Sequence, residues 1–275
     1  MRLTKAPIED IGLLMIENPA CTLTGTLLSS LASAGVAVSI CDTYHLPNAV
    51  MLPLDGVSIH AMRTRALAEL AKPKKKRAWQ QIVACKIYFQ AQVIQHLERE
   101  SALLKRLAQE VDPGDSKNRE ATAARIYWRV VYSDLEKGFR RSGENKINPF
   151  LNYGYAVVRS AIARSLVGAG LTPIFGLFHK SRDNAFALAD DLLEVYRPFV
   201  DQYIRGLLIS KVDLSEHPFK KELLRILTTR LIVRGEVSPF LSAIDSTVES
   251  LVKIVTVGAK SRLVFPDLCE FRDTV

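Results

Sequence analysis

The sequence from residue 178 to residue 198 reads Phe178-His179-Lys180-Ser181-Arg182-Asp183-Asn184-Ala185-Phe186-Ala187-Leu188-Ala189-Asp190-Asp191-Leu192-Leu193-Glu194-Val195-Tyr196-Arg197-Pro198. Its apolar residues recur at helical spacing, so we expect a buried helix over residues 185–208. Acids lie close to the apolar face of that helix, where a packed core would favour leucine. Histidine and carboxylates can share one divalent cation, which makes a phosphodiester reactive. The stretch therefore indicates both a helical core and a candidate metal site.

The acids of this helix do not all face the same way. At about 100° per residue, Asp190 points roughly opposite the apolar face and should be solvated. Asp191 borders the apolar face, and Glu194 shares its flank because residues three apart on a helix are neighbours. A buried acid there needs a metal or a cation such as Arg197. The spacing favours neither alternative over the other.

The rest of the chain predicts an α+β fold. Before residue 58, short strands at residues 11–16, 36–40 and 48–54 surround a helix at residues 22–34 that is capped near Thr22 or Thr24 and ended by Gly35. After that point the pattern is helical almost throughout, at residues 79–97, 119–138, 149–170, 185–208, 221–233 and 239–257. We therefore expect a small mixed domain at residues 1–57 and a larger helical domain at residues 58–275.

Composition limits the class of protein. With 275 residues, 48% of them apolar and 24% charged, the chain is typical of a globular protein and not of a disordered one. The net charge of +8 suits a nucleic acid partner without requiring one. Four scattered cysteines without a CxxC pair indicate reduced thiols of a cytosolic protein. We expect neither a signal peptide nor a membrane span.

Two further residues could complete a metal site with Glu194. His179 follows a run with two glycines and a proline, residues 170–178, which would position it rigidly; a lone histidine at such an edge is otherwise an ordinary packed residue. Glu120 begins a helix whose next residues are small, although the helix dipole also favours an acid there. As a set, two carboxylates and one imidazole suit Mg²⁺ or Mn²⁺, and the nitrogen favours Mn²⁺.

Basic and polar residues supply candidate DNA contacts. A basic run precedes Trp79, and it would bind phosphates in a DNA-binding protein but otherwise form a solvated surface. The turn at residues 145–154 can present amides to phosphates, or simply cap a helix. Two arginines in the next apolar helix need a carboxylate or phosphate partner if they are buried. The candidate DNA-binding residues are Lys74, Lys75, Lys76, Arg77, Asn152, Arg159 and Arg164.

Four separated segments give the chain a family resemblance. They are residues 79–87, 120–128, 148–155 and 170–201, within a similarity that covers roughly residues 5–245. In these segments the chain resembles the CRISPR-associated integrase, the nuclease subunit of the spacer-acquisition complex. The pattern at residues 184–198 resembles members from type II systems. The resemblance implies a metal-binding catalytic triad of Glu120, His179 and Glu194, with Asp191 orienting the site.

The resemblance also implies an architecture and an activity. It implies an N-terminal β-rich domain and a C-terminal all-α catalytic domain, in a bacterial cytoplasmic homodimer bridged by a small ferredoxin-like partner subunit. Family members have additional strands before the segment that begins at Pro7, whereas here only residues 1–6 precede it. The implied reaction joins the 3′-hydroxyl of a captured DNA fragment to a phosphodiester at the edge of a CRISPR repeat. The alternatives are a non-integrating metal-dependent DNA nuclease and a non-catalytic DNA-binding scaffold.

Overall fold

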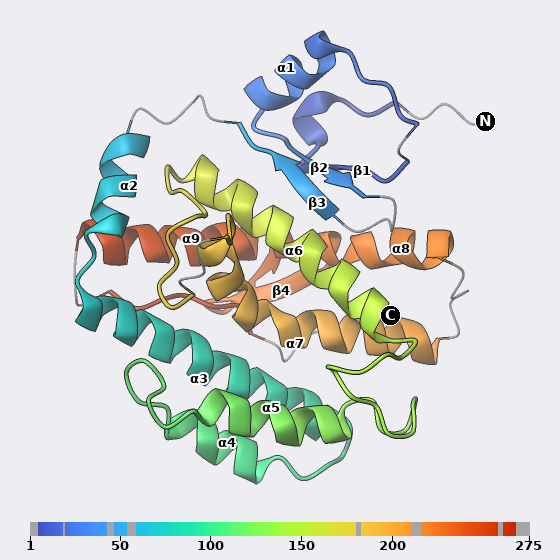
Figure 1. Ribbon diagram of the computed structural model, residues 1–275, viewed down its shortest axis with the longest axis vertical. Coiled ribbons are helices and arrows are strands. Elements are labelled where there is room, and N and C mark those ends of the chain that lie inside the picture. Colours follow the sequence, from blue (N-terminus) through green and yellow to red (C-terminus); the bar gives the residue numbers. More distant parts are fainter. Residues whose placement is uncertain are drawn as a thin grey trace.

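The described N-terminal residues form a three-stranded sheet, a helix and a short 3₁₀ helix at Ile8–Asp10. The computed structural model describes residues 5–18, 20–42, 47–53, 59–179, 183–210, 216–257 and 261–267. Strand β1 (Leu13–Ile16) pairs in parallel with β2 (Ala37–Cys41), and β2 pairs antiparallel with β3 (Pro47–Met51) (Figure 1). Two parallel neighbours need a crossover connection, which α1 (Gly25–Ser33) supplies. The predicted strand–helix–strand–strand order is confirmed.

Thr24 and Gly35 mark the two ends of α1, as the sequence predicts. The Thr24 side chain accepts a hydrogen bond from the Leu27 amide at 3.2 Å. Gly35 follows the helix with φ of +72°, a conformation that costs glycine least. Within the described residues β1 is an edge strand, so a further strand could pair with its outer side.

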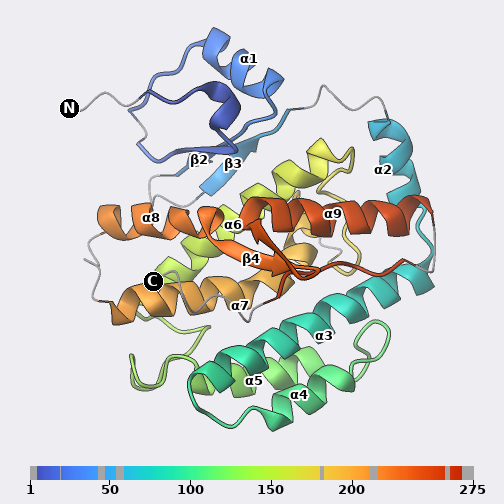
Figure 2. The ribbon, with the colours of Figure 1, turned by 180° about the vertical axis from the view of Figure 1, so that it is seen from behind.

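The sheet packs against α6 (Asn148–Gly168) of the helical part (Figures 1 and 2). The hydroxyl oxygens of Ser39 on β2 and Ser160 on α6 lie 3.5 Å apart in this interface. Arg164 donates from Nε to the carbonyl oxygen of Gly35 at 3.1 Å. The expected domain boundary between residues 57 and 58 lies at the end of segment 54–58, outside the described residues, and remains a prediction.

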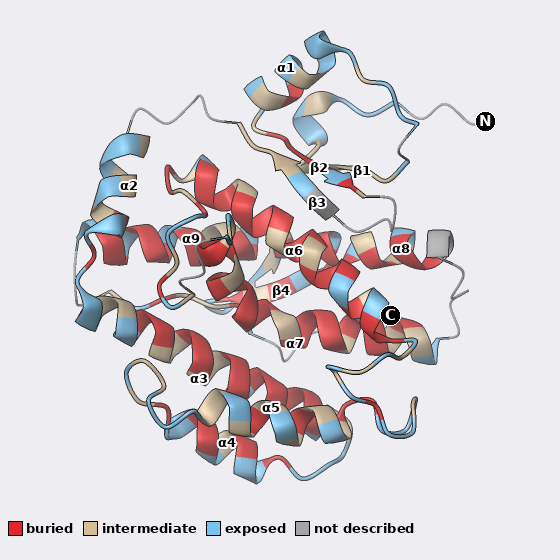
Figure 3. Cartoon of the chain, in the orientation of Figure 1, coloured by how far each residue is buried: buried red, intermediate tan, exposed pale blue. Residues whose placement is uncertain are grey.

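Helix α7 (Ala187–Ile209) is the centre of the helical part. It packs on α6 along one side and on α3 (Lys72–His96) along the other, as both ribbon views show (Figures 1 and 2). Figure 3 shows buried residues along most of its length, because neighbouring elements cover it on several sides. The remaining helices are α2 (His60–Ala68), α4 (Ala102–Gln109), α5 (Arg119–Val130), α8 (Glu216–Leu224) and α9 (Phe240–Thr256).

The α+β fold is confirmed, and two predicted helices end earlier than expected. Helix α5 stops at Val130 rather than continuing to residue 138. Arg205 on α7 donates to the carbonyl of Val131 at 2.8 Å and to Asp134 at 2.8 Å, so tertiary contacts replace the expected helical turns. The predicted helix at residues 221–233 is instead the end of α8, a 3₁₀ turn and a strand.

That strand belongs to a hairpin which the sequence pattern did not indicate. Strand β4 (Arg230–Val233) pairs antiparallel with β5 (Glu236–Pro239). The two connecting residues, Arg234 and Gly235, have φ of 56° and 84°, as a tight hairpin of this twist requires. The helical part thus contains a small sheet in addition to its helices.

The described residues bear on the expected absence of a membrane span and on the cysteines. No helix among them combines the length and apolarity needed to cross a bilayer. Cys21, Cys41 and Cys85 are free thiols in the described part of the chain. Cys269 lies outside the described residues.

Candidate metal centre

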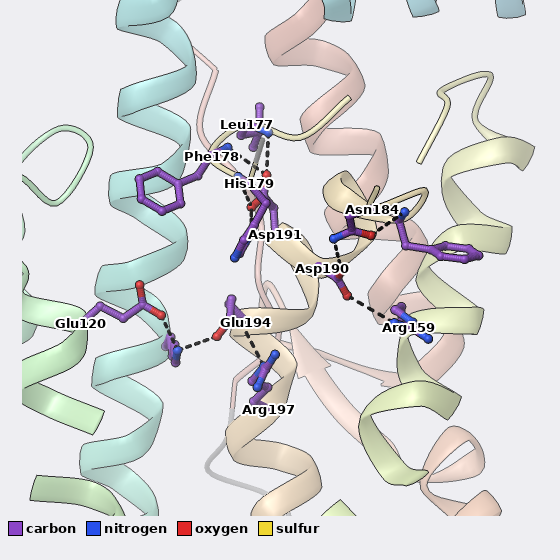
Figure 4. Close-up of polar contacts among 12 residues, drawn as sticks. Glu120, Arg159, Leu177, Phe178, His179, Asn184, Asp190, Asp191, Glu194 and Arg197 are labelled. Carbon is purple, nitrogen blue, oxygen red and sulfur yellow. Dashed lines mark hydrogen bonds and ion pairs between the residues drawn. The ribbon is translucent and has the colours of Figure 1, made fainter. Parts of the chain in front are cut away.

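Asp191 fixes the loop that leads into α7. Its Oδ2 accepts the amides of Leu177 at 2.5 Å and Phe178 at 3.0 Å, while its Oδ1 lies 2.5 Å from His179 Nδ1 (Figure 4). The Asp191 side chain is fully buried, so these contacts hold in a water-excluded environment. Asp191 is thus buried, as its predicted position beside the apolar face implies, and its orienting role stays a prediction.

Gly176 allows the loop to approach Asp191 this closely. A Cβ at this position would lie 2.4 Å from the His179 carbonyl oxygen and 3.0 Å from Asp191 Oδ2. No side chain fits there without moving backbone, so glycine is required by space rather than by its φ angle. The amide of Leu188 donates to the carbonyl of Pro173 at 2.7 Å and holds the other end of the loop on α7.

His179 is oriented by its neighbours and stays accessible. Its side chain is 41% exposed, and the Nδ1 contact with Asp191 leaves Nε2 as the nitrogen that could bind a metal. The hydrogen bond to Asp191 raises the pKa of His179 above its usual range, although burial works in the opposite direction. The Trp79 ring meets the imidazole edge-on at 5.8 Å and stacks on Phe178 at 4.4 Å.

Glu120 and Glu194 come from different helices and share one cation. The Lys86 ammonium on α3 lies 2.5 Å from Glu120 Oε1 on α5 and 2.5 Å from Glu194 Oε2 on α7 (Figure 4). The Lys86 side chain is only 10% exposed and that of Glu194 only 7%. Arg197 forms a second ion pair with Glu194, 3.0 Å from Oε1, so the salt bridge considered as an alternative is present.

These charges determine the protonation of the buried groups. Burial opposes the ionisation of Glu194, but Lys86 and Arg197 outweigh it and hold the pKa of Glu194 below its usual range. Burial likewise opposes the charge on Lys86, yet Glu194 and Glu120 raise the pKa of this ammonium. His179 also lowers the pKa of Glu194.

The residues present fit a divalent cation in chemistry, although the three donors do not converge. Within the described residues no three histidine, cysteine or acidic side chains are gathered around one point. Two oxygens of the predicted set nevertheless face one buried cation, and the imidazole precedes the helix of Glu194 with its Nδ1 engaged by Asp191. Two carboxylates and one imidazole are a donor set for Mg²⁺ or Mn²⁺.

Asp190, which we expected to be solvated, is partly buried instead. Its side chain is 19% exposed and lies 3.9 Å from Arg159 Nη1. It also accepts a hydrogen bond from Asn184 Nδ2 at 2.8 Å (Figure 4). The prediction was wrong because the loop before α7 and the neighbouring α6 cover the face that a helical wheel leaves open.

The candidate DNA-binding residues lie in different surroundings. Lys74, Lys75, Lys76 and Arg77 occupy the exposed or half-exposed first turns of α3, where Lys75 donates to the carbonyl of Ala68 at 3.4 Å. Three others have internal partners. Arg159 approaches Asp190 and lies over the Phe186 ring, Arg164 binds Gly35, and Asn152 accepts from Arg141 at 2.6 Å. Their role in DNA binding stays a prediction.

Sequence reasoning missed two features of this region. The first is Lys86. The sequence pattern that could have revealed it is its position between Val83 and Ile87, two fully buried residues of an apolar stripe. The second is a groove of about 670 Å³ beside α5, and the residues that line it, all of them described, include no acid. The sequence pattern that could have revealed this groove is a set of arginines interleaved with aromatic residues, which is typical of nucleic-acid-binding surfaces. The charged and aromatic residues of this arginine groove are Arg125, Trp128, Arg129, Phe139, Arg140 and Arg141.

Solved structures with a similar fold cover nearly the whole chain. A Cas1 protein from Thermotoga maritima matches with a TM-score of 0.76 at 16% identity, over 94% of this chain and 90% of that one. A casposase bound to its integration product matches with a TM-score of 0.78 at 20% identity, over 92% of this chain and 80% of that one. At these identities the likeness shows the fold alone.

Sequence comparison shows the family. The family model described as CRISPR associated protein Cas1 matches residues 2–231. The CRISPR-associated endonuclease Cas1 of Neisseria meningitidis serogroup C (strain 8013) is 35% identical over 274 residues, which cover 97% of this chain and 88% of the relative. The chain belongs to the Cas1 family of CRISPR-associated endonucleases.

Proposed function

We propose that this chain is a metal-dependent DNA integrase of a type II-like CRISPR system, which inserts captured DNA fragments into a CRISPR array. The observation that carries the proposal is one arrangement of buried charge. Glu120 and Glu194, from two helices, face a single cation next to an imidazole that Asp191 orients. A scaffold that only bound DNA would not need this combination of donors.

Glu120, His179 and Glu194 would hold Mg²⁺ or Mn²⁺, with His179 binding through Nε2. When bound, the metal would favour deprotonation of the attacking hydroxyl and stabilise charge on the transition state and the leaving oxygen. Asp191 contributes by keeping the imidazole in one tautomer and one orientation. Arg197 keeps Glu194 ionised through its ion pair at Oε1 and leaves Oε2 to face the site.

The reaction is a transesterification. The 3′-hydroxyl oxygen of the captured fragment forms a bond to a repeat phosphorus, and the bond from that phosphorus to the leaving 3′-oxygen breaks. The attacking hydroxyl loses its proton and the leaving oxygen gains one, so no oxidant or covalent protein intermediate is needed. Water in place of the DNA hydroxyl would give hydrolysis, which is the nuclease alternative.

The basic surfaces support DNA binding on both sides of the centre. The run Lys74–Arg77 lies on α3, the helix that carries Lys86 roughly 15 Å farther along at 1.5 Å per residue. The arginine groove lies on α5, the helix that begins with Glu120. Both can bind phosphates, and the exposed Phe178 next to His179 offers an aromatic face for a base.

The proposed assembly is a homodimer bridged by a small ferredoxin-like subunit, in the bacterial cytoplasm. A solved Cas6-RT-Cas1–Cas2 complex matches this chain with a TM-score of 0.71 at 18% identity, over 93% of this chain and 32% of that one. That protein assembles with Cas2, which supports a comparable small partner here. The Neisseria relative supports the type II-like assignment. Residues 1–57 and 58–275 are the proposed domains.

A strand-transfer assay tests the function. The chain, with and without the small partner, is incubated in Mn²⁺ with a short duplex and a supercoiled plasmid that carries a repeat. We expect covalently joined fragment and plasmid. Cleaved plasmid without joined product would support the nuclease alternative, and DNA binding without either product would support the scaffold.

A matched pair of variants tests the site. Glu194→Gln should abolish joining because it removes a proposed ligand charge, whereas Asp190→Asn, four residues earlier on the same helix, should retain it. Circular dichroism confirms that both variants fold. Equal activity of the two variants would contradict the assignment of Glu194.

A further inference from the structure

Lys86 occupies an unusual position for a lysine. Its ammonium is 2.5 Å from an oxygen of Glu120 and 2.5 Å from an oxygen of Glu194, with 10% of the side chain exposed. The flanking Val83 and Ile87 on α3 are fully buried, so the side chain leaves an apolar stripe to reach the two acids. Buried ion pairs add little net stability compared with apolar packing, so stability alone does not account for a lysine here.

The ammonium and a divalent cation would compete for the same oxygens. A metal bound to Glu120 Oε1 and Glu194 Oε2 would take up the space between the two acids, where the Lys86 nitrogen now lies. Two cations cannot occupy that space together, because they would repel one another in a medium of low dielectric constant. The lysine stem has four flexible carbons and can move the ammonium away.

We propose that Lys86 is the resident cation of this centre, and that metal binding is an exchange in which the Lys86 ammonium leaves Glu120 and Glu194. The proposal rests on the proposed metal site. In the absence of metal, Lys86 keeps two acids from different helices together without mutual repulsion. On metal binding, Lys86 lowers the apparent affinity, because its two ion pairs must first be broken.

Arg197 provides the matched control. It also forms an ion pair with Glu194, at 3.0 Å, but through Oε1, and it stacks over the Tyr155 ring at 4.7 Å. Removing Arg197 deletes a positive charge near Glu194 without clearing the space between the two acids. A general electrostatic effect would therefore appear in both variants, and an exchange effect only when Lys86 is changed.

Calorimetric titration of the full chain with Mn²⁺ tests the inference, using wild type, Lys86→Met, Lys86→Gln and Arg197→Met. We expect both Lys86 variants to bind Mn²⁺ at least about tenfold more tightly, which corresponds to ~1.4 kcal/mol, and Arg197→Met to change by much less. Lys86→Gln keeps a polar side chain, so it replaces Lys86→Met in the titration if Lys86→Met folds poorly. Glu120→Gln should weaken Mn²⁺ binding when it is introduced into wild type or into any of these variants. That result would show that Mn²⁺ binds at Glu120.

Thermal unfolding gives a second measurement. In EDTA the Lys86 variants should melt below wild type, because Glu120 and Glu194 then lack their shared cation, and Mn²⁺ should raise their melting temperature more than it raises that of wild type. Unchanged or weaker Mn²⁺ binding by the Lys86 variants would overturn the exchange, as would an equal gain in Arg197→Met. If wild type and variants all fail to bind Mn²⁺, the proposed metal site is itself wrong.

Discussion

Glu194 and Asp201 lie two turns apart on α7, and both are buried, with 5% and 1% of their surface exposed. They are stabilised in different ways. Asp201 accepts hydrogen bonds from the hydroxyls of Tyr127, at 2.9 Å, and Tyr155. Glu194 instead forms ion pairs with cations from α3 and from its own helix. Helix α7 thus carries one carboxylate, Asp201, that is bound by neutral hydroxyl donors, and another, Glu194, that is bound by charged side chains.

The two surroundings shift the pKa in opposite directions. Burial raises the pKa of Asp201 from 3.8 to about 6, and the tyrosine hydrogen bonds only partly offset it. Cations hold the pKa of Glu194 below its usual range in spite of burial. A cation beside a carboxylate can be exchanged for a metal ion, whereas displacing the donors of Asp201 would leave two buried tyrosine hydroxyls without an acceptor. The comparison therefore distinguishes an acid that accepts hydrogen bonds from two tyrosines of the core from the acid to which the proposed chemistry is assigned.

The largest expected effect is on strand transfer. Alanine at Glu120, His179 or Glu194 should lower joining by at least about 10³-fold, because metal stabilisation of transition-state charge contributes several kcal/mol at 1.36 kcal/mol per tenfold. Asp201→Asn should stay within a few-fold of wild type. Gel quantification of joined product measures both. Wild-type joining by any of the three alanine variants would remove that residue from the proposed triad.

The second effect concerns stability and should fall on Asp201. Asp201→Ala leaves the buried Tyr127 and Tyr155 hydroxyls without their acceptor, which should cost about 3 kcal/mol of unfolding free energy. Urea unfolding measures this cost, and Asp201→Asn, which keeps an acceptor oxygen, should lose less. A loss below about 1 kcal/mol for alanine, the size of one ordinary hydrogen bond, would mean that the tyrosines find other partners.

The third effect is a pH dependence that belongs to Asp201. Because its pKa is raised on folding, the folded state binds the proton more readily than the unfolded state. The stabilisation from this group is complete below its unfolded pKa of 3.8 and is lost as pH rises through about 6. The change should be roughly 2–3 kcal/mol. Urea unfolding of wild type and Asp201→Asn from pH 4 to pH 7 isolates the contribution of Asp201 as the difference between their unfolding free energies. A difference that stays constant with pH would contradict the raised pKa of Asp201.

The smallest expected effect comes from the residue that orients the site. Asp191→Asn should reduce Mn²⁺ affinity or joining by about 10–100-fold, as for other partners of metal-binding histidines. The reason is that the neutral side chain of asparagine would hold the His179 ring and the backbone N–H groups of the loop less firmly than the Asp191 carboxylate does. Asp190→Asn is the control, because Asp190 contacts Asn184 and Arg159 rather than the loop amides. Equal losses in the two variants would show that the site does not depend on the specific contacts of Asp191 with the loop amides and His179.

Part of this centre could be predicted because it is local in sequence. Asp191 and Glu194 follow from the periodicity of one helix, and the loop before that helix brings His179 back onto Asp191. Glu120 comes from another helix, so its local sequence marked it only as one candidate acid at a helix start, and the family resemblance implied its place in the triad. Lys86 was missed because a helical wheel treats a lysine as solvated and does not show which acids a neighbouring helix presents.

The errors in the fold have the same origin. Helix α5 was expected to continue past Val130, and nothing in that segment shows that Arg205, far along the chain, takes the Val131 carbonyl. The β4–β5 hairpin has a local signal, β-branched residues beside Gly235, but a helical period fits such a short apolar run equally well. Local patterns identified the N-terminal strands and most of the helices, and a long-range contact decided where α5 ends.

The stacked pair of Trp79 and Phe178 gives the molecule an optical reporter. The chain has two tryptophans. Trp79 stacks on the residue before His179, and Trp128 lines the arginine groove with Arg141 at 6.0 Å from its ring. Replacing Trp128 by phenylalanine leaves an emission that comes from beside His179 alone, and replacing Trp79 leaves one from the groove. Occupancy of the proposed metal site and of the arginine groove could then be followed separately, in real time and without an attached dye.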